Sequence, residues 1–190
     1  YYLNTNEHMR ASLPVETRDR RFINWCKGQY PLHQYKRLNP LMHEIRAIKL
    51  PEEIQQLRKA CEITRDGFNR VLKFLKPGVM EYEIEAEYVH EFVKQGASGF
   101  GYDPIVASGR NACVLHYISN DAPCNDGDLL LMDVGARYGN YNADLTISIP
   151  VNGRFSERQK QVYNAVLRVQ KAAMQMLRPG TTIPEYHREV

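Results

Sequence analysis

The sequence predicts an α+β fold, because amphipathic helical segments flank a run of short strand-like segments. Residues 50–78 and 80–97 carry apolar side chains at the three- and four-residue spacing of a helix. Between residues 99 and 150 the pattern changes to short runs rich in β-branched and aromatic residues, separated by Gly, Asn and Asp. Helical spacing returns at residues 156–180. We expect the strands to pair in antiparallel fashion, since their connections are short.

The first 46 residues are less regular than the rest of the chain. Residues 14–28 predict a helix that opens near Pro14 and closes at Gly28. Residues 30–46 contain two prolines and predict a connector rather than a regular element.

The later helices have recognisable beginnings and core faces. Pro51 and the two glutamates after it suit a first helical turn, where a missing N–H is tolerated and negative charge is favourable. In the second helix Ile84, Tyr88 and Phe92 form one apolar stripe. Ser156 is the expected N-cap of the last long helix.

Four segments between these helices are predicted as strands. Residues that favour turns separate them. The segments are residues 102–109, 112–119, 129–136 and 141–151.

The chain contains a candidate internal repeat. LKPG at residues 75–78 recurs as LRPG at residues 177–180, and each copy joins a long helix to the start of another. The alternative is chance similarity between two amphipathic helices. The chain begins without methionine and stops inside a predicted helix, so we expect it to be part of a longer protein.

Composition excludes several classes of function. The chain has 190 residues, 43% of them hydrophobic, which suits one core rather than two large domains. The net charge is +3, and the basic residues are scattered rather than gathered into the patch typical of nucleic-acid-binding proteins. No apolar run of about 18 residues predicts a membrane span, and no secretory signal is evident. The four cysteines lack metal-ligand spacing and suit reduced thiols of a cytoplasmic protein.

Two aspartates in the strand region are the first functional candidates. If Gly139 and Asn140 form a two-residue hairpin loop, Asp133 lies opposite Thr146 and becomes a diagonal neighbour of Asp144 on one face. Like charges this close favour a bound cation, and paired carboxylates suit hard divalent ions. The alternative is a solvated polar face with Asp144 at the surface of the hairpin. Either face of the second strand could be the buried one.

The amino-acid sequence around these aspartates resembles that of a known family. DVGARYGNYNADLT, with Asp133 and Asp144, is similar to the first metal-binding segment of the Xaa-Pro aminopeptidases and the related prolidases, which have the pita-bread fold. The resemblance runs from about Ile45 to the C-terminus and includes FGYDPIVASGRNACVLHYISND and IPVNGRFSERQKQVY. Methionine aminopeptidases share the fold and the aspartate spacing, but ADLT and PVNG are closer to the proline-directed branch.

The resemblance implies a dinuclear metallopeptidase. Asp133 would chelate one divalent ion and Asp144 would bridge two, most commonly manganese, with cobalt, zinc or magnesium as alternatives. A metal-bound hydroxide would attack the carbonyl before proline in peptides with proline second. His116 would be the catalytic histidine that contacts substrate and steadies the intermediate. Tyr102 would line the substrate pocket, whereas His90 and His187 match no ligand.

The resemblance also implies what this chain lacks. Residues 1–46 would be the tail of an N-terminal domain with its linker, and residues 47–190 the first half of the catalytic domain. The remaining ligands, a histidine and two glutamates, belong to the second half, so these residues alone are expected to be inactive. An exposed half-sheet favours a homo-oligomer. Ile147 and Ser148 replace the usual Arg-Thr of the family.

Two other functions remain open at this point. One is a prolidase that cleaves Xaa-Pro dipeptides. The other is a non-catalytic relative that uses the pita-bread cleft to bind a partner. The presence of the histidine and two glutamates would favour an enzyme over the binding module.

Overall fold

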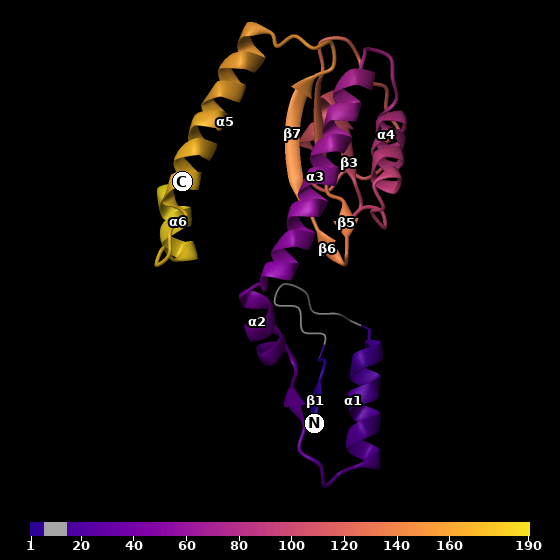
Figure 1. Cartoon of the computed structure of the whole chain (residues 1–190), viewed down its shortest axis with the longest axis vertical. Helices are drawn as coiled ribbons and strands as arrows, with labels where there is room; N and C mark the ends of the chain where they lie inside the picture. The colour runs from indigo at the N-terminus through magenta and orange to yellow at the C-terminus, as the bar shows by residue number, and fades with distance from the viewer. Residues whose placement is uncertain (6–14) are drawn as a thin grey trace. The chain divides into compact units, whose positions relative to one another are not determined.

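The computed structural model describes residues 1–5 and 15–190 and confirms the α+β class (Figure 1). These residues form two compact units, Tyr1–Ile54 and Gln55–Val190. The helices are α1 (Arg18–Gln29), α2 (Asn39–Ala47), α3 (Pro51–Phe74), α4 (Glu81–Lys94), α5 (Glu157–Met176) and α6 (Ile183–Glu189), with a short 3₁₀ helix at Gly109–Cys113. The strands are β1 (Tyr2–Leu3), β2 (Lys36–Arg37), β3 (Ile105–Ser108), β4 (Leu129–Val134), β5 (Arg137–Tyr138), β6 (Tyr141–Asn142) and β7 (Leu145–Pro150).

The first unit contains α1, α2 and the short parallel pair of β1 and β2. Helix α1 begins at Arg18 because the Thr17 hydroxyl accepts a hydrogen bond from the N–H of Arg20. Pro14, the predicted opening residue, lies outside the described residues. The prediction of a connector over residues 30–46 is wrong for its second part, which forms α2. Pro40 is accommodated there because it lies in the first turn.

The second unit starts with the two helices that the sequence predicts. Helix α3 begins at Pro51, and α4 follows after a turn in which Gly78 has a φ of 94°. Ile84, Tyr88 and Phe92 of α4 are all fully buried, which confirms the predicted stripe. Hydrophobic burial on this face therefore holds α4 in the core.

A three-stranded antiparallel sheet in the order β3–β4–β7 packs against these helices. Asp133 of β4 lies opposite Thr146 of β7, as predicted. Beyond β4, Tyr138 of β5 pairs with Tyr141 of β6. Gly139 and Asn140 between them have φ values of 56° and 65°, as a tight two-residue hairpin loop requires.

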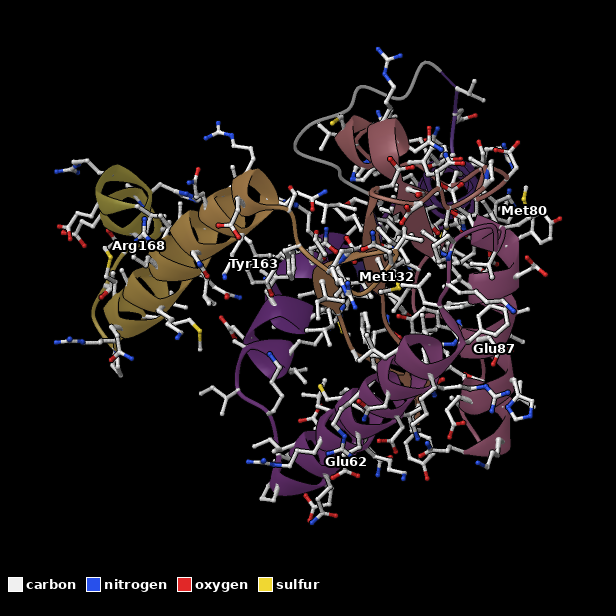
Figure 2. The ribbon with its side chains drawn as sticks, turned by 90° about the horizontal axis from the view of Figure 1, so that it is seen from above. Glu62, Met80, Glu87, Met132, Tyr163 and Arg168 are labelled. Atoms are coloured by element: carbon white, nitrogen blue, oxygen red, sulfur yellow. The ribbon has the colours of Figure 1, made fainter. Side chains whose placement is uncertain are left out.

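The core lies between α3, α4 and one face of the sheet. Leu130, Met132 and Val134 of β4 alternate into it and are fully buried. The Tyr88 hydroxyl donates to Sδ of Met132 at 3.3 Å, so even the polar end of this ring has a partner. Figure 2 shows Met132 among the crowded side chains of the interior, whereas Glu62 and Arg168 lie at the outside.

The predicted strand over residues 112–119 is wrong. The segment contains the end of the 3₁₀ helix and then an irregular loop. His116 has a φ of 55°, which interrupts an extended backbone. Leu115 is 92% exposed, so the apolar side chains that predict a strand here do not reach the core.

The candidate repeat corresponds to two similar helix pairs. Helices α5 and α6 are joined through Pro179-Gly180 much as α3 and α4 are joined through Pro77-Gly78. The φ of Gly180 is 96°, close to that of Gly78. Ser156 caps α5, as predicted, by accepting from the N–H of Gln159. The common origin of the two pairs stays a hypothesis.

Two simpler predictions are also met in the described ranges. None of the helices there is long and apolar enough to cross a membrane. All four cysteines are free thiols, with Cys26 and Cys124 buried and Cys61 and Cys113 exposed. Burial raises the pKa of the Cys124 thiol to about 11.

The contact between α3 and α4 yields a stability prediction at Gly67. A Cβ added there would lie 2.8 Å from Cδ1 of Tyr88 and 3.0 Å from Cε1 of Phe92, and both rings are fully buried. Alanine is the better helix former by about 1 kcal/mol, but overpacking a core costs about 1–3 kcal/mol. We expect Gly67→Ala to lower the free energy of unfolding by roughly 1–2 kcal/mol in urea denaturation.

The matched control is Gly28→Ala in α1. A Cβ at Gly28 meets no described atom within 4 Å, so the same substitution should be neutral or raise the stability of its own unit by up to about 1 kcal/mol. A gain in stability from Gly67→Ala would show that the helices can move apart.

Candidate functional site

The four candidate residues meet in one pocket of the second unit. The pocket has a volume of about 480 Å³ and is lined by Tyr102, Asp103, Ile105, His116, Ile118, Asp133 and Asp144. These residues come from the segment before β3 and its first residue, the loop after the 3₁₀ helix, and one end of the β4–β7 pair, where β4 ends and β7 begins. The fold therefore brings together positions that are far apart in the sequence.

The two aspartates approach each other because of the hairpin register. Asp133 is half-buried near the end of β4, and Asp144 is exposed immediately before β7. The opposite faces of both strands carry the apolar residues, with Val134 and Ala143 buried. The polar face is therefore the open one, and this resolves the question of which face is buried.

The Tyr102 hydroxyl links the two carboxylates. Its oxygen lies 2.7 Å from Oδ1 of Asp133 and 3.2 Å from Oδ1 of Asp144. A phenol has one hydrogen to donate, so it serves one carboxylate fully at a time. Burial, and then the hydrogen bond to Asp133, raise the pKa of Tyr102 above its ordinary value. Tyr102 therefore stays a protonated donor at neutral pH.

Gly135 allows the backbone just after β4 to lie close to the backbone of Ala143. An added Cβ would lie 1.8 Å from the carbonyl oxygen of Ala143, a distance that no side chain can occupy. The Gly135 carbonyl accepts from the N–H of Gly101 at 2.8 Å, and the N–H of Ala143 donates to the carbonyl of Ala136 at 2.9 Å. This close approach fixes how far Asp133 lies from Asp144.

His116 enters the pocket from an exposed loop. The next residue, Tyr117, donates from its hydroxyl to Oε2 of Glu81 at 2.7 Å. Burial, followed by this hydrogen bond, raises the pKa of Tyr117 to about 12. Asn120, which is buried with a φ of 47°, accepts from the N–H of Val106 and ties the end of the loop to β3.

Sequence analysis missed Glu81, Tyr117 and Asn120. Glu81 is the first residue of α4, where an acidic side chain is common and predicts nothing beyond a favourable charge. An asparagine after an apolar segment is one signal for a left-handed turn, and it could have identified Asn120. His90 on α4 and His187 on α6 are both exposed, and neither is among the residues that line the pocket.

The chemistry of the pocket suits a divalent metal in part. Two converging carboxylates provide oxygen ligands, which Mg²⁺ and Mn²⁺ prefer. Such ions commonly take about six ligands. Within residues 1–5 and 15–190, no group of three or more His, Cys, Asp or Glu side chains could hold a metal ion. The described residues therefore fit part of a metal site.

Related proteins share this segment of sequence. An Xaa-Pro aminopeptidase of Haemophilus influenzae is 44% identical over 151 residues, which cover 80% of this chain and 35% of that protein. An Xaa-Pro dipeptidase of Rattus norvegicus is 38% identical over 156 residues, covering 80% of this chain and 32% of that protein. The chain spans about a third of the length of these relatives.

Solved structures show the same fold. A proline aminopeptidase P II of Yersinia pestis aligns with a TM-score of 0.85 at 34% identity, covering 99% of this chain and 43% of the other. An Escherichia coli aminopeptidase P variant, in complex with substrate, aligns with a TM-score of 0.85 at 36% identity and covers 99% and 43%. The expected likeness to aminopeptidase P, with its pita-bread fold, is confirmed.

The match to the family covers the whole of the second unit and all four pocket residues singled out by the sequence. The model of metallopeptidase family M24 matches residues 55–190. This span includes most of α3, all of α4, α5 and α6, and the whole β3–β4–β7 sheet. The chain belongs to metallopeptidase family M24.

Proposed function

We propose that this chain contributes the first part of the active site of a metal-dependent aminopeptidase, which removes an N-terminal residue that precedes proline. The observation that carries the proposal is the convergence of Tyr102, His116, Asp133 and Asp144 on one pocket. The Xaa-Pro aminopeptidase relatives support the choice of substrate. Residues 1–46 would be the tail of an N-terminal domain with its linker, and residues 47–190 the beginning of the catalytic domain.

Each pocket residue has a separate task in this proposal. Asp133 and Asp144 would hold two divalent metal ions, most commonly manganese. The metal, when bound, supplies an activated water and polarises the scissile carbonyl. Tyr102 orients the carboxylates through its hydroxyl. His116 faces the same pocket and would donate a hydrogen bond to the substrate carbonyl, where negative charge develops.

Residues 1–190 alone would have little activity under this proposal. Two carboxylates alone leave a metal ion short of ligands, and loosely held metal is a poor catalyst. The relatives are about three times as long as the segment that they share with this chain. The four free thiols support a reducing compartment such as the cytoplasm. The homo-oligomer expected from the sequence stays a proposal that size measurement would test.

A prolidase is the second candidate, because the rat Xaa-Pro dipeptidase is 38% identical over the shared region. The two enzymes differ in the length of substrate that they accept. The full-length protein should be assayed in the presence of manganese on an Xaa-Pro dipeptide and on a tripeptide with proline at the second position. Faster cleavage of the tripeptide supports the aminopeptidase, and cleavage of the dipeptide alone supports the prolidase.

The proposed metal ligands give the next prediction. In the full-length protein, Asp133→Asn and Asp144→Asn should each lower kcat/KM on the tripeptide by more than about 100-fold. Substitution of residues that only support metal ligands already lowers metal affinity or activity by about 10–100-fold. Both variants should also weaken manganese binding in calorimetric titration.

Asp126→Asn is the matched control for these variants. Asp126 lies outside the pocket and accepts from Nδ2 of Asn152, a bond that an asparagine oxygen can also accept. The activity of the Asp126→Asn variant should equal that of the wild-type protein. Full metal affinity and activity in either of the other two variants would contradict the assignment of the ligands.

The hydroxyl that joins the carboxylates leads to a stability prediction. Hydrogen bonds to charged groups contribute about 1.5–3 kcal/mol when shielded, and Tyr102 is partly exposed. We expect Tyr102→Phe to lower the free energy of unfolding by about 1 kcal/mol in urea denaturation with EDTA present. Tyr82→Phe, at a tyrosine that is 54% exposed, should have no effect. Equal stability of the two variants would mean that the bond adds nothing to folding.

A further inference from the structure

One fully buried carboxylate in the second unit has no task in the chemistry proposed above. Glu81 begins α4 and has 0% exposure. Its Oε1 accepts from the N–H of Ser108 at 2.7 Å and from Nδ2 of Asn111 at 3.1 Å. Its Oε2 accepts from the Tyr117 hydroxyl at 2.7 Å and from the N–H of Ala122 at 3.0 Å. A buried carboxylate needs such donors, because burial alone strongly disfavours its charge.

The four donors lie within, or at the two ends of, the segment that carries His116. Ser108 ends β3 just before the segment, and Ala122 lies after it. Tyr117, which follows His116 directly, supplies the donor nearest to the pocket. The N–H of Glu81 also donates to the carbonyl of Ala122 at 2.9 Å. One side chain on a rigid helix is therefore joined to both ends and the middle of this segment.

Apolar burial does little to hold the part of the segment near His116. Val114 is 55% exposed, Leu115 is 92% exposed and Ile118 is 57% exposed. His116 itself has the left-handed φ of 55°, which a non-glycine residue adopts only when its surroundings impose it. The hydrogen bonds of Tyr117 and Asn120, which both follow His116, and that of Asn111 before it supply this restraint.

The Tyr117 hydroxyl also has other partners. It accepts from Nδ2 of Asn111 at 2.9 Å and lies 3.2 Å from Oδ1 of Asp121. Without the Tyr117 hydroxyl, Glu81 still has three donors, so its charge remains satisfied. Replacing Glu81 with glutamine would instead turn an NH₂ group toward other donors. Tyr117→Phe is therefore the milder probe.

We propose that Glu81 is a positioning residue for His116 and acts through the Tyr117 hydroxyl. The inference rests on the proposed role of His116 toward the substrate carbonyl. Glu81 holds Tyr117, and the short link from Tyr117 to His116 sets where the imidazole enters the pocket. The proposed metal ligands lie elsewhere, with Asp133 in β4 and Asp144 just before β7.

The test compares the Tyr117→Phe variant with the wild-type protein, both at full length. Amide hydrogen exchange over residues 113–119 should become at least about 10-fold faster, because the segment loses one of its few restraints. Exchange in β4 and β7 should stay the same. On the proline tripeptide, kcat should fall about 10-fold with KM within about twofold, since the lost interaction acts in the transition state.

Tyr82→Phe is the matched control, because Tyr82 follows Glu81 on α4 and its side chain is exposed. It should change neither exchange nor kcat. A second comparison places Tyr117→Phe in a His116→Ala background. There it should cause no further loss of kcat, since its effect passes through His116.

Three outcomes would overturn the positioning role. These are unchanged exchange over residues 113–119, a rise in KM with unchanged kcat, and an equal loss of kcat in the His116→Ala background. If the unchanged protein cleaves no proline peptide, the proposed function fails instead. The exchange result then decides by itself whether the Tyr117 hydroxyl holds the segment that carries His116.

Discussion

The register between β4 and β7 is the constraint on which the pocket depends. Asp133 and Asp144 face the same side because Asp133 lies opposite Thr146. A slip of one residue would turn every side chain of one strand to the other face. The two-residue loop at Gly139 and Asn140 prevents the slip, since both residues take the positive φ that this loop requires. A local backbone requirement therefore decides which carboxylates meet.

The core and the pocket are built on the same elements. The Thr64 hydroxyl of α3 donates to the carbonyl of Ala60 at 2.8 Å and accepts from the N–H of Ala136 at 2.9 Å, which joins the helix to the turn after β4. Met132, next to Asp133, is fully buried against the helices. One face of β4 thus stabilises the fold while its other face presents the Asp133 carboxylate to the pocket, so packing holds the position of this carboxylate.

Local patterns predicted the regular elements well and the irregular ones poorly. Apolar stripes identified α3 and α4, and turn residues identified the hairpin, because these depend on neighbours in the sequence. The apolar residues around His116 predict a strand, because the sequence does not reveal that Leu115 is exposed. The resemblance to a family placed Tyr102 and His116 among the candidates, which spacing alone could not do. Long-range hydrogen bonds to Glu81 leave no trace in a local pattern.

Gly135 shows how a residue can look essential without touching any reacting atom. The space for its Cβ is occupied by the carbonyl of Ala143, so every missense change at this codon would push the strands apart. In a genetic screen position 135 would appear as intolerant as the aspartates near it. A loss of activity at this position reports on backbone spacing, and protein abundance rather than turnover would separate it from a true ligand.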